Sequence, residues 1–182
     1  MKKCGDWSQL ASFEMGLLSE KDWTAKWIDP EIEHEADKRQ PASYLKKKFI
    51  VEQLGNARLY ITSHGVYSAY INGVKVGNFI LAPGTSQYNV RLQYQTYDIS
   101  ELLKVGENEI VVTVGDGWWR GDTGYGGERN SFGTDLAVLC QLEIDKEIVL
   151  ISDESWLASQ DGPLRLNDLM QGEQYDARKE KI

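Results

Sequence analysis

One segment decides the fold of this chain: Ala69-Tyr70-Ile71-Asn72-Gly73-Val74-Lys75-Val76. The dipeptide Asn72-Gly73 separates two short runs of β-branched and aromatic residues. A two-residue turn of type I′ needs positive φ at both central positions, and Asn followed by Gly satisfies that need at low cost. The segment therefore predicts a β-hairpin with Asn72 and Gly73 at its tip.

Segments with strand composition flank this hairpin on both sides. They are short, rich in β-branched and aromatic residues, and separated by turn signals. The expected strands cover residues 44–51, 57–63, 66–71, 74–80, 93–99, 109–114, 136–143 and 147–152. Asp98 or Ser100 is expected to cap one helical turn that Gly106 ends. Because no long amphipathic helix interrupts these strands, the sequence predicts an all-β, antiparallel two-sheet sandwich of jelly-roll type.

The apolar phases of these strands indicate which side chains form the core. We expect five of them to lie between the sheets: Leu59, Ile61, Tyr70, Val111 and Val138. Nearer the start of the chain, Phe13, Met15 and Leu17 alternate with other residues at strand period.

Length, charge and cysteine content restrict the class of protein. A chain of 182 residues suits one domain, and a net charge of −8 argues against a nucleic-acid partner. Cys4 and Cys140 lack metal-ligand spacing, so both are expected to be free thiols. No apolar stretch is long enough for a membrane span and no signal peptide is visible, so we expect no membrane partner and, by default, a cytoplasmic location.

The loop at residues 115–133 carries most of the functional signal. It holds seven of the 17 glycines together with aromatic and charged side chains. Flat rings beside charged groups suit a sugar, which has apolar faces and hydroxyl rims. The candidate carbohydrate-binding residues are Trp118, Trp119, Arg120, Asp122 and Tyr125, with Tyr88 and Arg91 nearby in sequence. The alternative is that the tryptophans simply cover a core.

The acids of the same loop raise the questions of catalysis and of metal binding. Glycosidases use two carboxyl groups that flank the scissile bond, and Asp116, Asp122 and Glu128 share this loop. Acids among glycines are more typical of calcium or hydroxyl ligands, so Asp116 and Asp122 are the metal candidates and no catalytic residue is predicted. His34 and His64 are expected in ordinary surface or turn positions.

A series of motifs in this order is similar to one known family. The motifs are Asp22-Trp23-Thr24-Ala25-Lys26-Trp27-Ile28, Ala57-Arg58-Leu59-Tyr60-Ile61-Thr62, Gly65-Val66-Tyr67, Tyr70-Ile71-Asn72-Gly73-Val74-Lys75-Val76-Gly77, Leu81-Ala82-Pro83-Gly84, Tyr94-Gln95-Thr96-Tyr97-Asp98, Gly115-Asp116-Gly117-Trp118 and Gly172-Glu173-Gln174-Tyr175-Asp176-Ala177-Arg178. Together they resemble the N-terminal β-sandwich module of bacterial α-L-rhamnosidases, glycoside hydrolase family 78. The resemblance implies a galactose-binding-domain-like sandwich over residues 23–182. Residues 1–22 resemble the tail of a preceding fibronectin-like domain, or a linker.

The resemblance also implies a division of labour. In this family the inverting hydrolysis of terminal rhamnose belongs to an (α/α)6 barrel, so this chain is expected to be non-catalytic. The implied partners are rhamnose-containing glycans and that catalytic barrel, with calcium as a possible ligand and no certain cofactor. One departure stands out, because Pro83-Gly84 is followed by Thr85, where the family often has tryptophan. Sugar recognition, a purely structural role and catalysis by the loop acids remain the three hypotheses.

Overall fold

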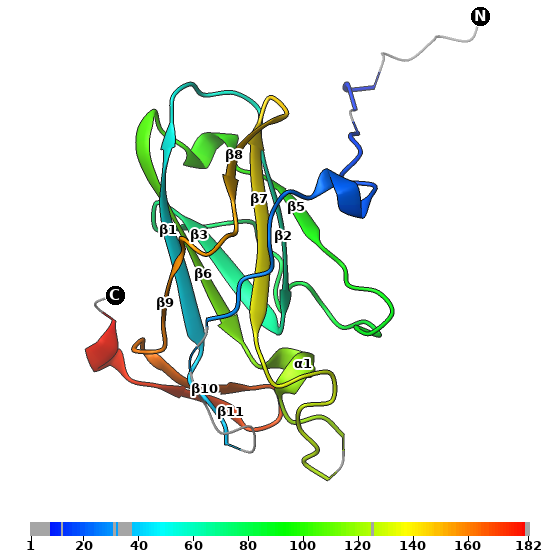
Figure 1. Cartoon of the computed structure of the whole chain (residues 1–182), viewed down its shortest axis with the longest axis vertical. Coiled ribbons are helices and arrows are strands. Elements are labelled where there is room, and N and C mark those ends of the chain that lie inside the picture. Colours follow the sequence, from blue (N-terminus) through cyan, green and yellow to red (C-terminus); the bar gives the residue numbers. More distant parts are fainter. Residues whose placement is uncertain (1–7, 12, 31, 33–37, 125, 181–182) are drawn as a thin grey trace, which may run out of the picture.

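The computed structural model describes residues 8–11, 13–30, 32, 38–124 and 126–180, and its body is a sandwich of two antiparallel sheets (Figure 1). The five-stranded sheet has the order β4 (Val74–Lys75), β3 (Val66–Ile71), β6 (Gly106–Gly115), β1 (Ser43–Val51), β9 (Leu157–Ser159). The four-stranded sheet has the order β5 (Gln95–Asp98), β2 (Ala57–His64), β7 (Ala137–Ile144), β8 (Glu147–Ile151). The predicted all-β sandwich is confirmed.

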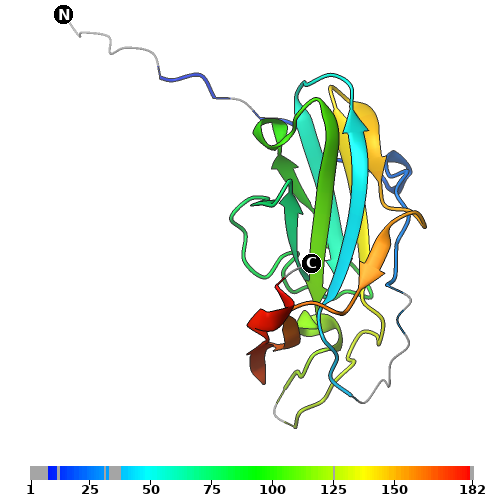
Figure 2. The same cartoon turned by 90° about the vertical axis from the view of Figure 1, so that its left-hand side faces the viewer.

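The remaining elements are small. A separate hairpin of β10 (Leu164–Asp168) and β11 (Gly172–Tyr175) lies at one end of the five-stranded sheet (Figure 2). The helical pieces are η1 (Glu20–Asp22), η2 (Ser100–Leu102), α1 (Gly117–Arg120) and η3 (Ala177–Lys179). Within the ranges that the structure describes, no helix has the length and apolar character needed to cross a bilayer.

The hairpin predicted at Asn72-Gly73 is confirmed. Both turn residues have positive φ, 51° and 81°, and Ile71 pairs with Val74 across the turn. The Asn72 side chain also joins the turn to β6, because its Oδ1 accepts from the Glu109 amide at 3.1 Å. The predicted helical turn is present as η2, but its cap and its end differ from the prediction. The N-cap is Ile99, which makes no side-chain capping bond, and the turn ends at Leu102, whereas Gly106 begins β6. Asp98 Oδ1 still accepts from the Ser100 amide at 3.0 Å.

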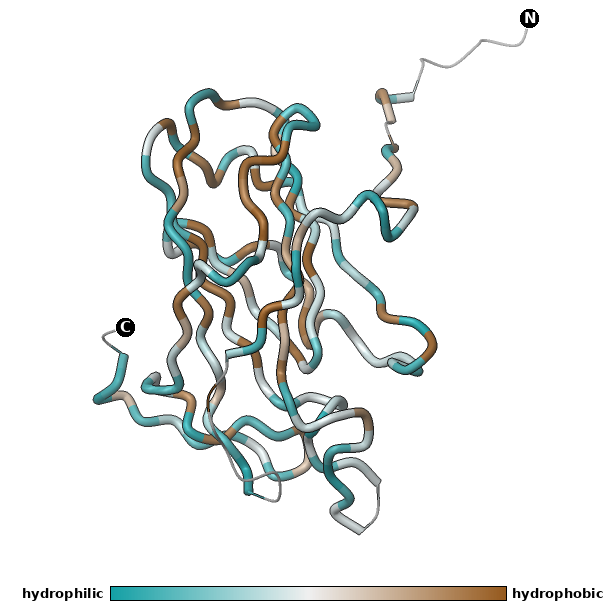
Figure 3. Tube along the Cα trace, in the orientation of Figure 1, coloured by the Kyte–Doolittle hydropathy of each residue, from teal (hydrophilic) through white to brown (hydrophobic). Residues whose placement is uncertain are grey.

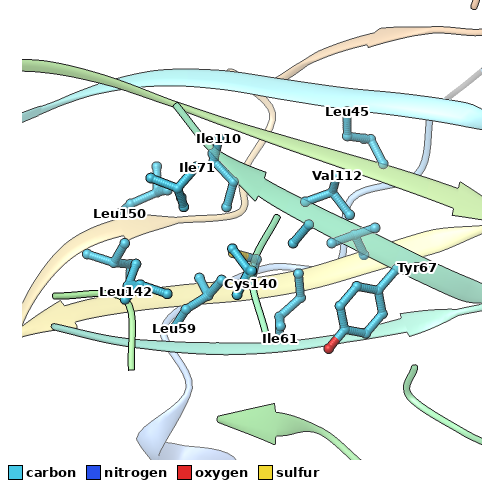
Figure 4. Close-up of a cluster of buried hydrophobic side chains, with 14 of the residues drawn as sticks. Leu45, Leu59, Ile61, Tyr67, Ile71, Ile110, Val112, Cys140, Leu142 and Leu150 are labelled. Carbon is cyan, nitrogen blue, oxygen red and sulfur yellow. The ribbon is translucent and has the colours of Figure 1, made fainter. Parts of the chain in front are cut away.

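The core fills the space between the two sheets (Figures 3 and 4). Leu59, Ile61 and Val138 are fully buried there, as predicted. Tyr70 and Val111 were predicted in the core, but they lie on the outer face of the five-stranded sheet, opposite each other on β3 and β6. In β3 both faces carry apolar residues, so hydrophobicity alone did not show which face points inward, whereas in β6 the outward face also carries Glu107 and Glu109.

Cys140 lies fully buried in this core as a free thiol, and burial raises its pKa. The other cysteine, Cys4, lies outside the described residues. The buried sulfur therefore acts as a small apolar side chain between the sheets.

Two predicted strands differ in the structure. β4 ends at Lys75 instead of at residue 80, because Gly77 has a φ of 63° and its backbone lies against the Tyr97 ring. The period-2 segment at residues 13–17 forms no strand among its described residues, and Phe13 is 97% exposed. That segment nevertheless touches the sandwich, since the Tyr94 hydroxyl donates to the Leu17 carbonyl at 2.7 Å. Its assignment to a preceding domain stays a prediction.

Candidate functional site

The glycine-rich loop at residues 115–133 follows β6, forms α1, and returns to β7 at one end of the sandwich (Figure 1). The sequence turns sharply there because Gly117 has a φ of 52°. A Cβ at Gly117 would come within 2.7 Å of the Val66 side chain and 3.0 Å of its backbone nitrogen. Only glycine lets this loop start so close to β3.

Two aromatic residues of the loop belong to a stack of rings, here called the aromatic stack. Its members are Trp27, His64, Trp119 and Phe132, and Tyr88 packs edge-on against Trp119. The centroid of the His64 ring lies 4.3 Å from that of Trp27 and 3.8 Å from that of Trp119. Trp119 also stacks at 6.2 Å on Phe132, and Tyr88 meets Trp119 at 5.6 Å and 73°. The stack thus connects the loop to β2 and to the N-terminal segment.

Burial divides this stack into an interior and two exposed ends. Tyr88 is 8% exposed and its hydroxyl donates to the Gly84 carbonyl at 2.7 Å. Trp27 and Phe132 keep 42% and 38% of their surface exposed. Sequence reasoning selected Trp119 and Tyr88 but missed Trp27 and His64, which are distant in sequence, and Phe132, which lies in the same loop as Trp119.

The position of His64 between two indole rings affects its charge. Burial lowers the pKa of His64, so the imidazole is neutral in the folded protein at pH 7. His64 thus lies at the end of β2 between two rings, and not in the surface or turn position expected of it.

A pH prediction follows from this shift. In the unfolded chain His64 titrates near pH 6.5, so just below that pH the unfolded chain binds more protons than the folded protein. We expect the free energy of unfolding to fall as the pH decreases from 7 to 5, and to fall less in a His64→Phe variant, which keeps a ring but cannot be protonated. Urea unfolding of both proteins at each pH measures the difference. Identical pH dependence in the two proteins would contradict it.

Charged residues of the loop form a second group of contacts, here called the charge network, with two residues from outside the loop. Its members are Asp116, Arg120, Asp122 and Arg129 of the loop, together with Asp168 and Arg39. Asp116 is 1% exposed and lies 2.7 Å from Arg120 Nε and 3.1 Å from Arg129 Nη2. Arg120 is 4% exposed and also donates to the Thr134 carbonyl at 3.2 Å. The amide of Asp116 donates to Asn167 Oδ1 at 2.9 Å, which joins the loop to β10.

Asp122 is the second buried acid of this network, at 2% exposure. Its Oδ2 accepts from Arg39 Nη2 at 2.6 Å and from Gln171 Nε2 at 2.9 Å. Its Oδ1 lies 3.1 Å from Arg129 Nε, although the two groups are not aligned for a hydrogen bond. Its amide donates to Asp168 Oδ2 at 2.8 Å. The network therefore fastens the loop to the β10–β11 hairpin and to the segment before β1.

The pKa values of Asp116 and Asp168 are shifted in opposite directions. Burial raises the pKa of Asp116, against the opposing effect of its arginines. Burial would also raise the pKa of Asp168, but backbone amides of Asp122, Gln171 and Met170 donate to this carboxylate and lower its pKa overall. Asp168 is thus held as an anion by the fold itself.

Calcium does not fit the residues proposed to hold it. The carboxylates of Asp116 and Asp122 are already paired with Arg39, Arg120 and Arg129, and a cation between them would face three guanidinium groups. Hard cations prefer several free oxygen ligands. Among the described residues, no cluster of three histidine, cysteine, aspartate or glutamate side chains is arranged to hold a metal.

The other described residues predicted to bind sugar, Trp118 and Arg91, belong to neither the aromatic stack nor the charge network. Trp118 is half-buried, and no ring contact joins it to another aromatic side chain in the described part of the chain. Arg91 is exposed on the turn at residues 86–91, and Tyr125 lies outside the described residues. The structure thus groups Trp119 with Tyr88, and Arg120 with Asp122. The six predicted residues that the structure describes do not form one group of contacts.

Comparison with known proteins places the chain in a family. Residues 52–182 match the family model described as the alpha-L-rhamnosidase N-terminal domain. An α-L-rhamnosidase of Formosa agariphila is 36% identical over 98% of this chain and 20% of the relative. This chain therefore spans about one fifth of the length of that relative.

Two solved structures have the same fold. The α-L-rhamnosidase of Aspergillus terreus is 40% identical with a TM-score of 0.88, over 92% of this chain and 20% of that one. The α-L-rhamnosidase of Streptomyces avermitilis, solved in complex with L-rhamnose, is 37% identical with a TM-score of 0.74, over 79% of this chain and 14% of that one. The chain belongs to the family of α-L-rhamnosidase N-terminal domains.

Proposed function

We propose that this chain is a non-catalytic module of a longer α-L-rhamnosidase polypeptide, and that it positions the rest of that polypeptide instead of binding sugar through the 115–133 loop. One observation supports the structural role most strongly. The charged side chains predicted to meet a sugar, Arg120 and Asp122, are 4% and 2% exposed and are bonded within the charge network. Groups committed to internal partners are poor candidates for sugar hydroxyls.

The same network argues against catalysis by the loop. An inverting glycosidase holds an acid and a base about 6.5–9.5 Å apart on either side of a bound sugar. Asp116 and Asp122 are buried and paired with arginine, while Glu128 is exposed on the loop surface. Hydrolysis is therefore assigned to the remainder of the polypeptide.

This proposal predicts where rhamnosidase activity resides. The purified 182-residue chain should release no nitrophenol from 4-nitrophenyl α-L-rhamnoside, whereas the longer polypeptide should do so. Deleting residues 23–182 from the longer polypeptide should lower its melting temperature, because the face that contacts the module becomes exposed. Turnover by the chain alone, abolished by Asp116→Asn or Glu128→Gln, would overturn the proposal.

Recognition of rhamnose-containing glycans is the second candidate. It is supported by the exposed ring surfaces of Trp27 and Phe132 at the ends of the aromatic stack and by the L-rhamnose complex of the Streptomyces avermitilis relative. Rings of this kind stack on the apolar face of a sugar. In this role Trp118, Arg91 and Tyr125 would supply further contacts, as the sequence suggests.

The two candidates differ in one simple assay. Electrophoresis of the native chain through a gel that contains a rhamnose-containing polysaccharide should show unchanged mobility if the module is structural. A weak site, with a Kd of about 10 μM to 1 mM for one sugar residue, would retard the chain. Retardation that is lost in both Trp118→Ala and Arg91→Ala, but kept in the remote Val105→Ala control, would favour glycan recognition.

A further inference from the structure

The outer face of the five-stranded sheet carries a long groove. Two hollows of about 430 and 930 Å³ lie along it and share Ser68, Thr113, Leu164 and Glu173, so they form one depression, here called the outer groove. Its floor is the outward-facing side of β3, β6 and β1, and the β10–β11 hairpin lies across one end (Figure 2). The remaining sheet surface in this view is not covered by any described segment.

Apolar side chains lie on the floor and at the rims of the outer groove, among polar ones. Tyr70 and Val111 form a cross-strand pair on its floor. At its rims, Leu157 is 70% exposed, Ile80 is 77% exposed and Tyr175 is 54% exposed. Large exposed apolar side chains that gather along one face of a domain mark an interaction site.

Three of the charged side chains that line the groove, Lys46, Glu109 and Glu180, have partners within it. Lys46 Nζ lies 2.8 Å from Glu109 across β1 and β6, on the floor. The Tyr175 hydroxyl donates to Glu180 Oε1 at 3.0 Å, at the rim. A partner that covers the groove would therefore meet Lys46 and Glu109 as an existing ion pair, and Glu180 as a carboxylate with one hydrogen bond already made, which lowers the desolvation cost of docking.

We propose that the outer groove is the surface on which this module docks against the remainder of its own α-L-rhamnosidase polypeptide. This inference rests on the proposed function. The chemistry favours protein over glycan as the occupant, because branched aliphatic side chains such as Leu157 and Ile80 gain from apolar contact but offer nothing to sugar hydroxyls. The core of a protein interface has this mixture of aromatic and aliphatic side chains.

The geometry of the chain supports the same partner. Glu180, the last described residue, lines the groove, so in a polypeptide of the relatives' length the following segment would leave from its rim. A domain tethered at that point docks intramolecularly, at an effective concentration in the millimolar range for a short linker. Because of this tether, a weak affinity of the groove for its partner is enough for docking, and so weak an affinity would not make the free module aggregate.

The test uses two charged substitutions at exposed positions of the groove. Leu157→Arg and Ile80→Arg should leave the free chain unchanged in circular dichroism and melting temperature, since both side chains are mostly exposed there. In the longer polypeptide each should lower the melting temperature of the docked module by about 3 °C or more, because a buried unpaired charge costs on the order of 1 kcal/mol at least.

The matched controls are Val105→Arg and Ile148→Arg, whose side chains are 61% and 47% exposed and do not line the groove. Both controls should melt like the wild type in either context. The inference is overturned if the groove variants also melt like the wild type in an active longer polypeptide. It is equally overturned if the free chain forms a dimer, or binds a rhamnose-containing polysaccharide, in a manner that Leu157→Arg abolishes. Failure of the proposed function would instead show as a longer polypeptide without rhamnosidase activity.

Discussion

The Asp116→Asn variant is expected to lose about 3–5 kcal/mol of unfolding free energy, the loss typical of breaking a buried ion pair. Asparagine keeps the shape of the side chain but removes the charge that faces Arg120 and Arg129 at 2.7 and 3.1 Å. Arg120, whose side chain is 5% exposed, would then lack its anion, and Arg129, whose side chain is 12% exposed, would keep only Asp122. Urea unfolding at pH 7, followed by tryptophan fluorescence, measures the loss.

The control for this prediction is Asp176→Asn. Asp176 pairs with Arg178 at 2.8 Å on the surface, and the Arg178 side chain is 88% exposed. Solvent screening makes such pairs weak, so the urea midpoint of this variant should match the wild type. Equal midpoints for Asp116→Asn and Asp176→Asn would show that the charge network does not hold the loop. If Asp116→Asn does not fold, Arg39→Gln, which removes a half-exposed partner of Asp122, provides a milder test of the same network.

The second large effect is expected at Trp119. Trp119→Ala removes the ring that stacks on His64 at 3.8 Å and that packs on Tyr88 and Gly133. Truncation of a buried tryptophan costs about 3–5 kcal/mol, and a half-buried ring places this variant at the lower end of that range. Thermal and urea unfolding of the purified variant measure the loss.

Its sequence neighbour provides a matched control. Trp118→Ala removes the same kind of side chain one residue earlier, where no ring contact to another described aromatic residue exists. This variant should lose about 1 kcal/mol or less, as is usual for a position outside the core. A loss at Trp118 as large as that at Trp119 would contradict the assignment of the stack as the part of the loop that supports the fold.

The sandwich could be predicted from sequence because its signals are local. The strand at residues 57–63 became β2 (Ala57–His64), and the positive φ values at Asn72 and Gly73 follow from a dipeptide that favours them. Local pattern failed where the signal was absent. β9, β10 and β11 are short, and their side chains are exposed or half-buried apart from Asp168, so no strong apolar alternation marks them.

Which face of a strand points into the core could be predicted only where the other face is polar. In β6 the outward phase holds Glu107, Glu109 and Thr113 beside Val111, and the inward phase holds Ile110, Val112 and Val114, so the pattern of the whole strand indicates that Val112 points inward and the prediction of Val111 was wrong. Val111 instead lines the outer groove.

The candidate site was predicted as a loop but not as a set of contacts. Its glycines and aromatic residues marked it clearly, yet Asp122 pairs with Arg39 across 83 positions and its amide meets Asp168 across 46. Nothing in a single sequence indicates such long-range pairs. From sequence alone, Arg120 and Asp122 have the composition of a ligand site. Once the long-range pairs are known, both residues belong to the charge network that holds the loop.

The most direct test of the structural account is a two-dimensional ¹H–¹⁵N spectrum of the chain titrated with L-rhamnose to 20 mM, with and without calcium. The account predicts that the indole signals of Trp118 and Trp119 and the amides of residues 115–133 keep their positions at every concentration. Saturable shifts of these signals, with an affinity that falls in Trp118→Ala, would contradict it and identify the loop as a rhamnose-binding site.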